Sequence, residues 1–109
     1  MIPKSNPFGP YFGHRHLPEI VMDDVCYCYN ELWFNVQLFD PHASLSILLE
    51  CPDGSAHAFS ARSAFDGTLG APLSIPGHYI TTAGQYTLSI QGPCRGADAR
   101  VSKAFTALA

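Results

Sequence analysis

Four cysteines come closest to a metal site in this sequence. Cys26 and Cys28 stand two apart in an expected strand, where such residues face the same side. Cys51 and Cys94 each border an expected turn. A four-thiolate zinc site is sterically possible, but the spacing lacks the repeated C-x₂₋₄-C pairs typical of zinc sites. We therefore expect buried thiols and no metal or cofactor, and keep open a zinc site or, in an oxidising compartment, a Cys51–Cys94 disulfide.

The remaining polar residues do not form a recognisable catalytic set. His14-Arg15-His16 places two imidazoles on one side of an extended segment, which supplies only two metal ligands. Ser55 and His57 stand two apart, but the sequence has no G-x-S-x-G motif. The segment Gly67–Gly70 lacks the lysine of a phosphate-binding loop. We expect no catalytic residues and no enzymatic activity.

Composition and charge limit the classes of partner. The 109 residues suit one domain; 47% are apolar and only 14% are charged, against about 25% in an average globular protein. This composition argues against a disordered chain and predicts that a partner covers part of the surface. The net charge of −3 argues against nucleic acid as a partner. Formal charges of +2 over 1–18, −7 over 19–66 and +2 over 67–109 are compatible with head-to-tail contacts between copies, and equally with a solvated surface.

No apolar run approaches the ~20 residues that a membrane-spanning helix needs. The stretch from Met1 to Pro10 lacks the charged and apolar regions of a secretory signal. We therefore expect no membrane segment and synthesis in a reducing cytoplasm, where cysteines remain thiols.

Residues 1–18 are predicted to form an extended N-terminal arm, and residues 19–109 to form the folded domain. Four prolines in the arm exclude a helix and a central strand. Phe8, Tyr11 and Phe12 supply large apolar area there. Such rings stabilise an extended segment only when they pack on its own domain or on a neighbour.

Alternation of apolar and polar residues predicts a strand over Leu32–Phe39, with Trp33 and Phe39 on the face opposite Phe34 and Leu38. If that face is exposed, its two aromatic rings form an apolar patch that needs a cover, and the arm is a candidate cover. The predicted interface residues are therefore Phe8, Tyr11, Phe12, Trp33 and Phe39.

The other elements are assigned from the same alternation and from turn residues. Asp53-Gly54 centres a predicted hairpin between strands at 44–51 and 56–62. The remaining expectations are strands within 19–29, a loop at 63–76, a short strand at 77–82, a strand at 84–91, a turn at 92–96, and a strand or short helix at 99–108.

One short motif resembles a known family. Thr82-Ala83-Gly84-Gln85-Tyr86-Thr87-Leu88 resembles the Asp-x-Gly-x-Tyr-x-Cys run of immunoglobulin-like domains. The resemblance implies a structural corner at Gly84 and Tyr86, in which the tyrosine hydroxyl bonds back to the preceding backbone. Thr82 stands in place of the acid and Leu88 in place of the cysteine, so the inter-sheet disulfide of antibody domains is absent.

A broader likeness covers roughly residues 32–107. The runs Leu-Ser-Ile-Leu-Leu-Glu-Cys-Pro-Asp-Gly and Ala-Gly-Gln-Tyr-Thr-Leu-Ser-Ile, with a Phe-Asp-Gly loop between them, resemble protease P-domains and bacterial or viral immunoglobulin-like modules. Together these features predict an all-β fold: an antiparallel immunoglobulin-like β-sandwich of about seven strands with an extended N-terminal arm.

The predicted function is that of a non-enzymatic structural or assembly module. It would bind neighbouring protein subunits, copies of itself or a larger assembly, through the arm and a sheet face. In kind it is similar to decoration or minor structural proteins of tailed viruses, which would place it in a virion. Two alternatives stay open: a small regulatory or inhibitory protein that binds one target through a sheet face or the 63–78 loop, and a carbohydrate-binding module.

Overall fold

The computed structural model describes residues 17–109. Phe8, Tyr11 and Phe12 of the predicted arm, and the His14–His16 segment, lie outside the described residues. Residues 17–109 contain no helix with the length and apolar character needed to cross a membrane. Their elements are β1 (Glu19–Val21), β2 (Val25–Tyr27), β3 (Leu32–Gln37), β4 (Ser44–Glu50), β5 (Ala56–Arg62), β6 (Leu73–Ile75), the 3₁₀ turn η2 (Gly77–Tyr79), β7 (Gly84–Cys94) and β8 (Ala97–Leu108).

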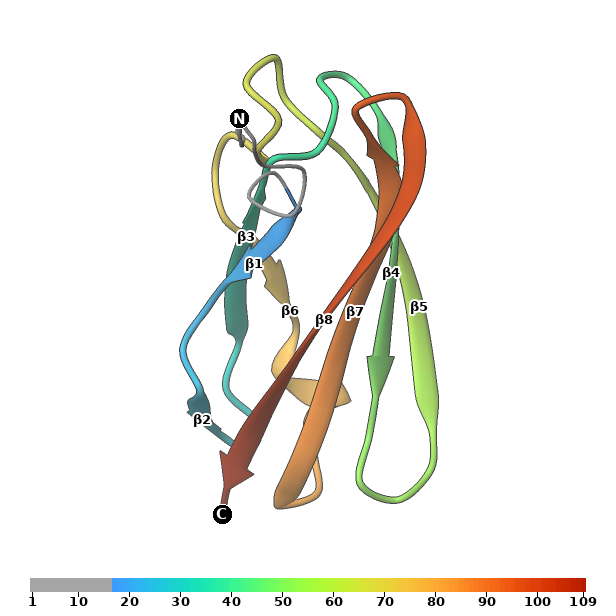
Figure 1. Ribbon diagram of the computed structural model, residues 1–109. Helices are drawn as coiled ribbons and strands as arrows, with labels where there is room; N and C mark the ends of the chain where they lie inside the picture. The colour runs from blue at the N-terminus through green and yellow to red at the C-terminus, as the bar shows by residue number, and fades with distance from the viewer. Residues whose placement is uncertain (1–16) are drawn as a thin grey trace, which may run out of the picture.

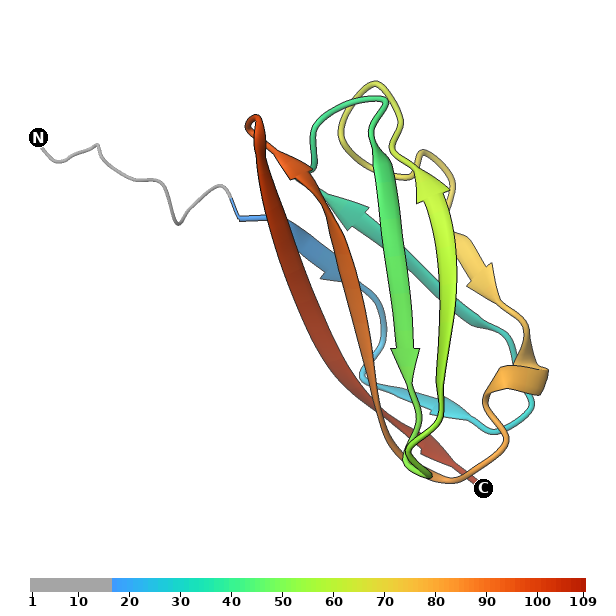
Figure 2. The same ribbon diagram turned by 90° about the vertical axis from the view of Figure 1, so that its right-hand side faces the viewer.

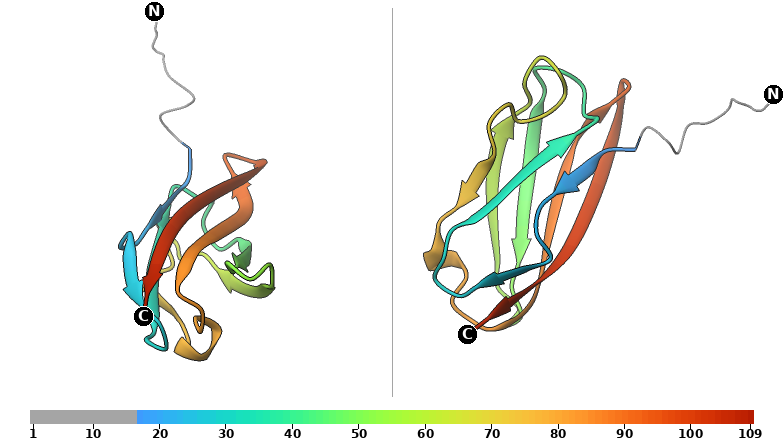
Figure 3. Two further views of the ribbon diagram at one scale, coloured as in Figure 1. Left: turned by 90° about the horizontal axis from the view of Figure 1, so that it is seen from below. Right: turned by 90° about the vertical axis from the view of Figure 1, so that its left-hand side faces the viewer.

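The strands form two sheets, which confirms an all-β fold. The smaller sheet has the order β1-β3-β6, and the larger has the order β2-β8-β7-β4-β5. Figure 1 shows the two sheets as separate layers; Figure 2 is turned to show β4 and β5, and the right panel of Figure 3 is turned to show β1 and β3. All pairs are antiparallel except β2 with β8, which run parallel over three residue pairs. The edge strands of the larger sheet are the short β2 and the longer β5. Within the described residues no strand pairs with the outer side of β5.

The core lies between the two sheets and is built from alternate residues of the strands. In β4 the buried residues are Leu45, Ile47 and Leu49, and in β7 they include Leu88 and Ile90. Successive side chains of a strand point to opposite faces, so the residues between them lie on the outer face of the sheet. Burying each such aliphatic side chain contributes about 1.5–3 kcal/mol, which makes this alternation the main local determinant of the fold.

The end of β3 corrects one predicted interface residue. The strand stops at Gln37, and Leu38 has a φ of 71°, which breaks the alternation. As a result Leu38 is 43% exposed, while Phe39 is only 4% exposed and belongs to the core. The prediction that Phe39 shares an exposed face with Trp33 was therefore wrong. Trp33 itself is 55% exposed, on the outer surface of the smaller sheet.

The stretch 19–29 contains strands as predicted, although they are two short ones in different sheets. Two other assignments differ from the sequence prediction. The loop predicted at 63–76 contains β6. The strand predicted at 77–82 is absent, because η2 closes with N–H donation from Tyr79 to Pro76 O and from Ile80 to Gly77 O. β6 therefore depends on pairing with the distant strand β3, whereas η2 is closed by its own local hydrogen bonds.

Both predicted turns join antiparallel strands, although one is shorter than expected. The hairpin at Asp53-Gly54 is confirmed: β4 and β5 pair from Ser44 with Arg62 to Glu50 with Ala56. The second turn consists of Arg95 and Gly96 alone, with φ of 56° and 81°. Two successive positive φ angles are typical of the type I′ turn that suits the twist of a hairpin. The final segment is a strand, β8, rather than a helix.

The predicted corner at Gly84 and Tyr86 is formed in the structure. The buried Tyr86 hydroxyl donates to Thr82 O at 2.7 Å and accepts from the Thr82 N–H at 3.2 Å. Its ring stacks on Phe105, with centroids 5.3 Å apart. Burial raises the pKa of Tyr86, which keeps the hydroxyl protonated and able to donate. Gly84 begins β7 with a φ of 144° and lies against Pro52.

Tyr86→Phe is expected to lower the free energy of unfolding by about 0.5–1.5 kcal/mol, because it removes the part-buried hydrogen bonds between the Tyr86 hydroxyl and the Thr82 backbone. Urea denaturation measures this loss. Tyr79→Phe is the matched control: within the described residues its ring packs on Phe59 and its hydroxyl has no hydrogen bond, so a change below about 0.5 kcal/mol is expected. Equal effects of the two substitutions would contradict a stabilising role for the corner.

Candidate protein-binding surface

Three connections gather at one end of the two sheets, at the top of Figure 1. They are residues 38–43 between β3 and β4, residues 63–72 between β5 and β6, and the Arg95-Gly96 turn between β7 and β8. We call this region the loop end. Loops held by a rigid scaffold are a common place for binding residues, so the loop end is a candidate site.

Asp40 ties the first connection to the third. Its carboxylate accepts hydrogen bonds from the N–H groups of Arg95 at 2.6 Å and Gly96 at 2.9 Å. The Asp40 N–H donates to Pro93 O at 2.9 Å. A charged acceptor on two backbone donors makes strong hydrogen bonds, so the turn is fixed relative to residues 38–43.

Ser63 ties the second connection to the first. This buried serine donates its hydroxyl proton to Asp40 O at 2.6 Å and accepts from the Ala43 N–H at 2.8 Å. Gly67 lies so close to the neighbouring loop that a Cβ there would be 2.4 Å from Phe39 O. All three connections are therefore held together by contacts between residues far apart in the chain.

The segment 64–70 presents Phe65 to solvent. The Ala64 N–H donates to Thr68 O at 2.6 Å, and the Asp66 carboxylate accepts from the Thr68 N–H at 3.1 Å and hydroxyl at 2.7 Å. Phe65 is 78% exposed, more than any other large hydrophobic residue of the described chain. An aromatic ring held out on a hydrogen-bonded loop loses little conformational entropy when a partner covers it.

Sequence reasoning did not name Phe65 as an interface residue. The one indication in the sequence was that Phe65 begins a Phe-Asp-Gly run in the glycine- and proline-containing stretch 63–76. Its exposure follows from the contacts of Asp40 and Ser63, which the sequence pattern does not contain.

The Asp66 hydrogen bonds should make this loop sensitive to acid. Donation from the Thr68 hydroxyl and N–H lowers the pKa of Asp66 below its ordinary value of 3.8. Because the folded pKa is the lower one, the stabilisation is present above that ordinary value and is lost as the pH falls through the lowered pKa. We expect the Thr68 amide to lose protection from hydrogen exchange, and its NMR signal to shift, in that acid range.

Asp66→Asn is the control for this acid response. Asp53 has the same arrangement with Ser55, whose hydroxyl and N–H lower its pKa. The substitution should remove the response at Thr68 and leave the response at Ser55 intact. An unchanged Thr68 titration in the variant would contradict the assignment.

A second exposed apolar surface lies at the opposite end of the molecule, where Figure 1 labels β2 and the C-terminus. Val25 and Tyr27 are directly paired with Thr106 and Leu108, so all four share one face of the larger sheet. Val25, Tyr27 and Leu108 are exposed. We call these three residues the C-terminal patch.

Trp33 forms a smaller feature on the outer face of the other sheet. Val21 pairs with Asn35, which places Val21 diagonally beside Trp33, and both side chains are exposed. The predicted pairing of Trp33 with Phe39 does not occur, because Phe39 is buried.

The four cysteines do not come together. Glu50 pairs with Thr87, so Cys51 lies near the start of β7 while Cys94 is its last residue; eight residues of extended strand, roughly 26 Å, separate the two levels. This separation excludes both the four-thiolate site and the Cys51–Cys94 disulfide. The Cys94 thiol donates to Leu38 O at 3.1 Å, and burial raises the pKa of Cys26. Among residues 17–109 no three His, Cys, Asp or Glu side chains are placed to hold a metal ion.

Comparisons of the chain with models of known families, with curated proteins and with solved structures found no match in any of the three. A function for this chain must therefore be argued from its own surface. The loop end and the C-terminal patch are two exposed apolar features of that surface.

Proposed function

We propose that this chain is a non-enzymatic assembly module that binds neighbouring protein subunits, in the first place further copies of itself. The observation that carries the proposal is the 78% exposed ring of Phe65 on a loop fixed by hydrogen bonds. A contiguous exposed apolar surface on a soluble protein marks a site of contact with another protein more often than a single exposed residue does. Membership of a viral particle stays a prediction from the sequence.

The proposal includes an immunoglobulin-like arrangement of the strands. In such domains the tyrosine corner lies on a strand flanked by two others of its sheet. The hydrogen bond of Tyr86 to Thr82 O, on a β7 that lies between β4 and β8, supports this arrangement. The order β1-β3-β6 of the other sheet supports it as well.

The two exposed apolar surfaces favour a head-to-tail contact. The loop end of one copy would meet the C-terminal patch of the next, which makes a heterologous interface that repeats along a row or closes into a ring. A stable interface buries about 800 Å² per partner, whereas one aromatic side chain buries about 150–250 Å². The proposal therefore assigns the remaining area to residues 1–18, through Phe8, Tyr11 and Phe12.

Sedimentation velocity of the full chain from about 1 µM to about 1 mM tests this proposal. We expect concentration-dependent association, and a monomer for either Phe65→Ser or Tyr27→Ser. A mixture of the two variants should form a one-to-one dimer and nothing larger, because each variant retains the surface that the other has lost. Deletion of residues 1–18 should weaken association. A chain that stays monomeric over the whole range contradicts self-assembly.

The same observation also supports the second candidate, a regulatory or inhibitory protein that binds one target through the 63–78 loop. That function requires a monomeric chain with Phe65 as the anchor. A single enzyme bound by the unmodified chain and by Tyr27→Ser, but not by Phe65→Ser, would favour it over self-assembly.

A further inference from the structure

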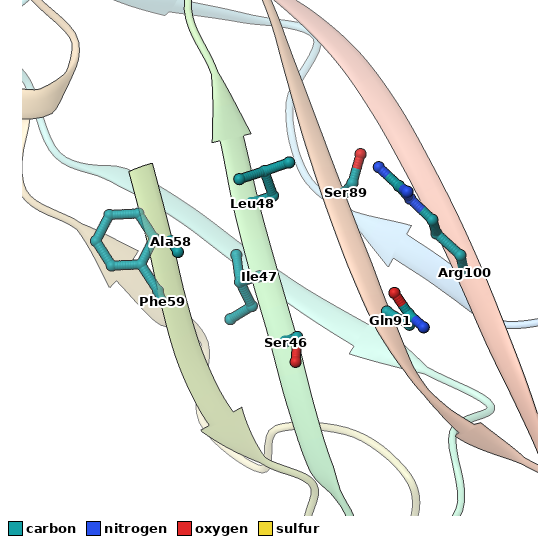
Figure 4. Close-up of a pocket in the computed structure, with 8 residues that line it drawn as sticks. All are labelled: Ser46, Ile47, Leu48, Ala58, Phe59, Ser89, Gln91 and Arg100. Atoms are coloured by element: carbon teal, nitrogen blue, oxygen red, sulfur yellow. The ribbon is translucent and has the colours of Figure 1, made fainter. Parts of the chain in front are cut away.

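The outer face of the larger sheet contains a hollow of about 270 Å³. Its side chains come from all four antiparallel strands of that sheet: Ser46 and Leu48 of β4, Ala58 of β5, Ser89 and Gln91 of β7, and Arg100 of β8. Figure 4 shows these residues. The hollow lies apart from the loop end and the C-terminal patch, so it does not depend on the assembly proposed above.

Strand register explains why the sheet is hollow at this place. Ser46 pairs with Gln91, and Gln91 pairs with Arg100, so these three side chains form one row across the sheet. In the next row Leu48 pairs with Ser89. Short side chains therefore stand beside long ones, and directly paired residues are close enough for the long ones to form walls around the short ones.

The chemistry of the walls is polar and positive on one side and apolar on the other. Ser89 is buried, and its hydroxyl lies 2.9 Å from the Ser102 hydroxyl, so it forms part of the floor. Leu48 supplies apolar surface. Arg100 extends from β8 with its guanidinium end toward Ser89 (Figure 4).

The Arg100 guanidinium has no carboxylate partner among residues 17–109. The ion pair of this part of the chain joins Lys103 to Asp24. Asp98, two residues from Arg100 on the same strand face, instead accepts a hydrogen bond from Gln91 Nε2 at 2.9 Å. The guanidinium N–H groups of Arg100 are therefore available to an external acceptor. Their planar arrangement matches the two oxygens of a carboxylate.

We propose that this hollow binds a small hydroxylated organic acid of monosaccharide size, such as a hexuronate. Arg100 binds the carboxylate, the Gln91 side-chain oxygen and the Ser46 hydroxyl bind ligand hydroxyls, and Leu48 packs against the C–H face of the ligand, while Gln91 Nε2 keeps its hydrogen bond to Asp98. The volume lies just below the 300–1,000 Å³ of typical ligand pockets, which suits a ligand of this size. Backbone N–H groups in the interior of a sheet are used in strand pairing, so they cannot supply further donors for a phosphate group. With the Arg100 guanidinium as the single charged donor, the site favours a carboxylate.

An NMR titration of the ¹⁵N-labelled full chain with glucuronate tests the site. We expect saturable shifts of the Gln91 side-chain amide, the Arg100 Nε–H and the Ser46 and Ser89 backbone amides, and no such response to glucose. Arg100→Gln should weaken binding by about tenfold or more. Arg62→Gln is the matched control, because Arg62 lies on the same outer face of the sheet but does not line the hollow. It should leave the affinity unchanged.

Ser46→Leu provides a second, independent variant. Ser46 is exposed on a strand, so leucine there should leave the fold intact, as the amide spectrum will report, while it fills the hollow and abolishes binding. Absence of saturable shifts at about 50 mM glucuronate, a range that would detect even very weak binding, would overturn the proposal. So would equal affinity of Arg100→Gln, or an equal response to glucose. An equal response to sulfate would show an unspecific anion site and would likewise overturn it.

Discussion

Phe65→Ser is expected to weaken association of the chain with its neighbour by about thirtyfold or more, while leaving the free energy of unfolding unchanged. The magnitude is that of an interface hot spot, about 2 kcal/mol or more for the loss of a central aromatic residue. Stability should not change, because the ring is 78% exposed and the hydrogen bonds of its loop come from Ala64, Asp66 and Thr68.

Sedimentation equilibrium gives the association constant, and urea denaturation gives the stability. Trp33→Ser is the informative comparison, since Trp33 is also an exposed aromatic residue but lies on the outer face of the smaller sheet. If Trp33→Ser abolishes association and Phe65→Ser does not, the sheet face is the binding surface and the loop end is not.

Gly67→Ala is expected to destabilise the fold by about 2–5 kcal/mol. Two costs add. Gly67 has a φ of 82°, which costs a residue with a Cβ about 1–2 kcal/mol. The new methyl group would also meet Phe39 O at 2.4 Å, and overpacking of this kind costs about 1–3 kcal/mol.

Gly54→Ala separates the two costs. Gly54 has nearly the same φ, 90°, but no atom lies within 4 Å of the position that its Cβ would occupy. It should therefore lose only the conformational part, about 1–2 kcal/mol. Thermal unfolding of the two variants side by side measures the difference, which is the cost of separating the loop from Phe39. If both variants lose the same stability, the close approach of these loops does not contribute.

The parts of the fold that the sequence predicted are those that depend on neighbouring residues. The hairpin at Asp53-Gly54 follows from Gly54, because glycine readily adopts the positive φ of 90° that this turn requires. Tyr86 bonds to Thr82, only four residues away, and the motif that contains both was sufficient to predict the contact. Alternation correctly predicted the buried face of β4 and of most of β7.

The parts that the sequence missed depend on residues far apart in the chain. Leu38 adopts a positive φ where residues 38–43 meet the β7–β8 turn, and this one angle exchanges the environments of Leu38 and Phe39. The loop end is fixed by the contact of Asp40 with Arg95, 55 positions later. A pattern with a period of two residues contains no information about such contacts, so Phe65 could not be selected as the anchor from the sequence alone.

Within residues 17–109 the outer edge of β5 is unpaired, which sets a condition for handling the protein. Its sequence, Ala-His-Ala-Phe-Ser-Ala-Arg, has no proline and a single formal charge, at its last residue Arg62. Edge strands that lack charges, prolines and bulges are templates for unwanted pairing with other chains. In concentrated solution, cross-β aggregation is therefore expected to begin at this strand, and a lysine in place of Ser60 would act as a gatekeeper against it.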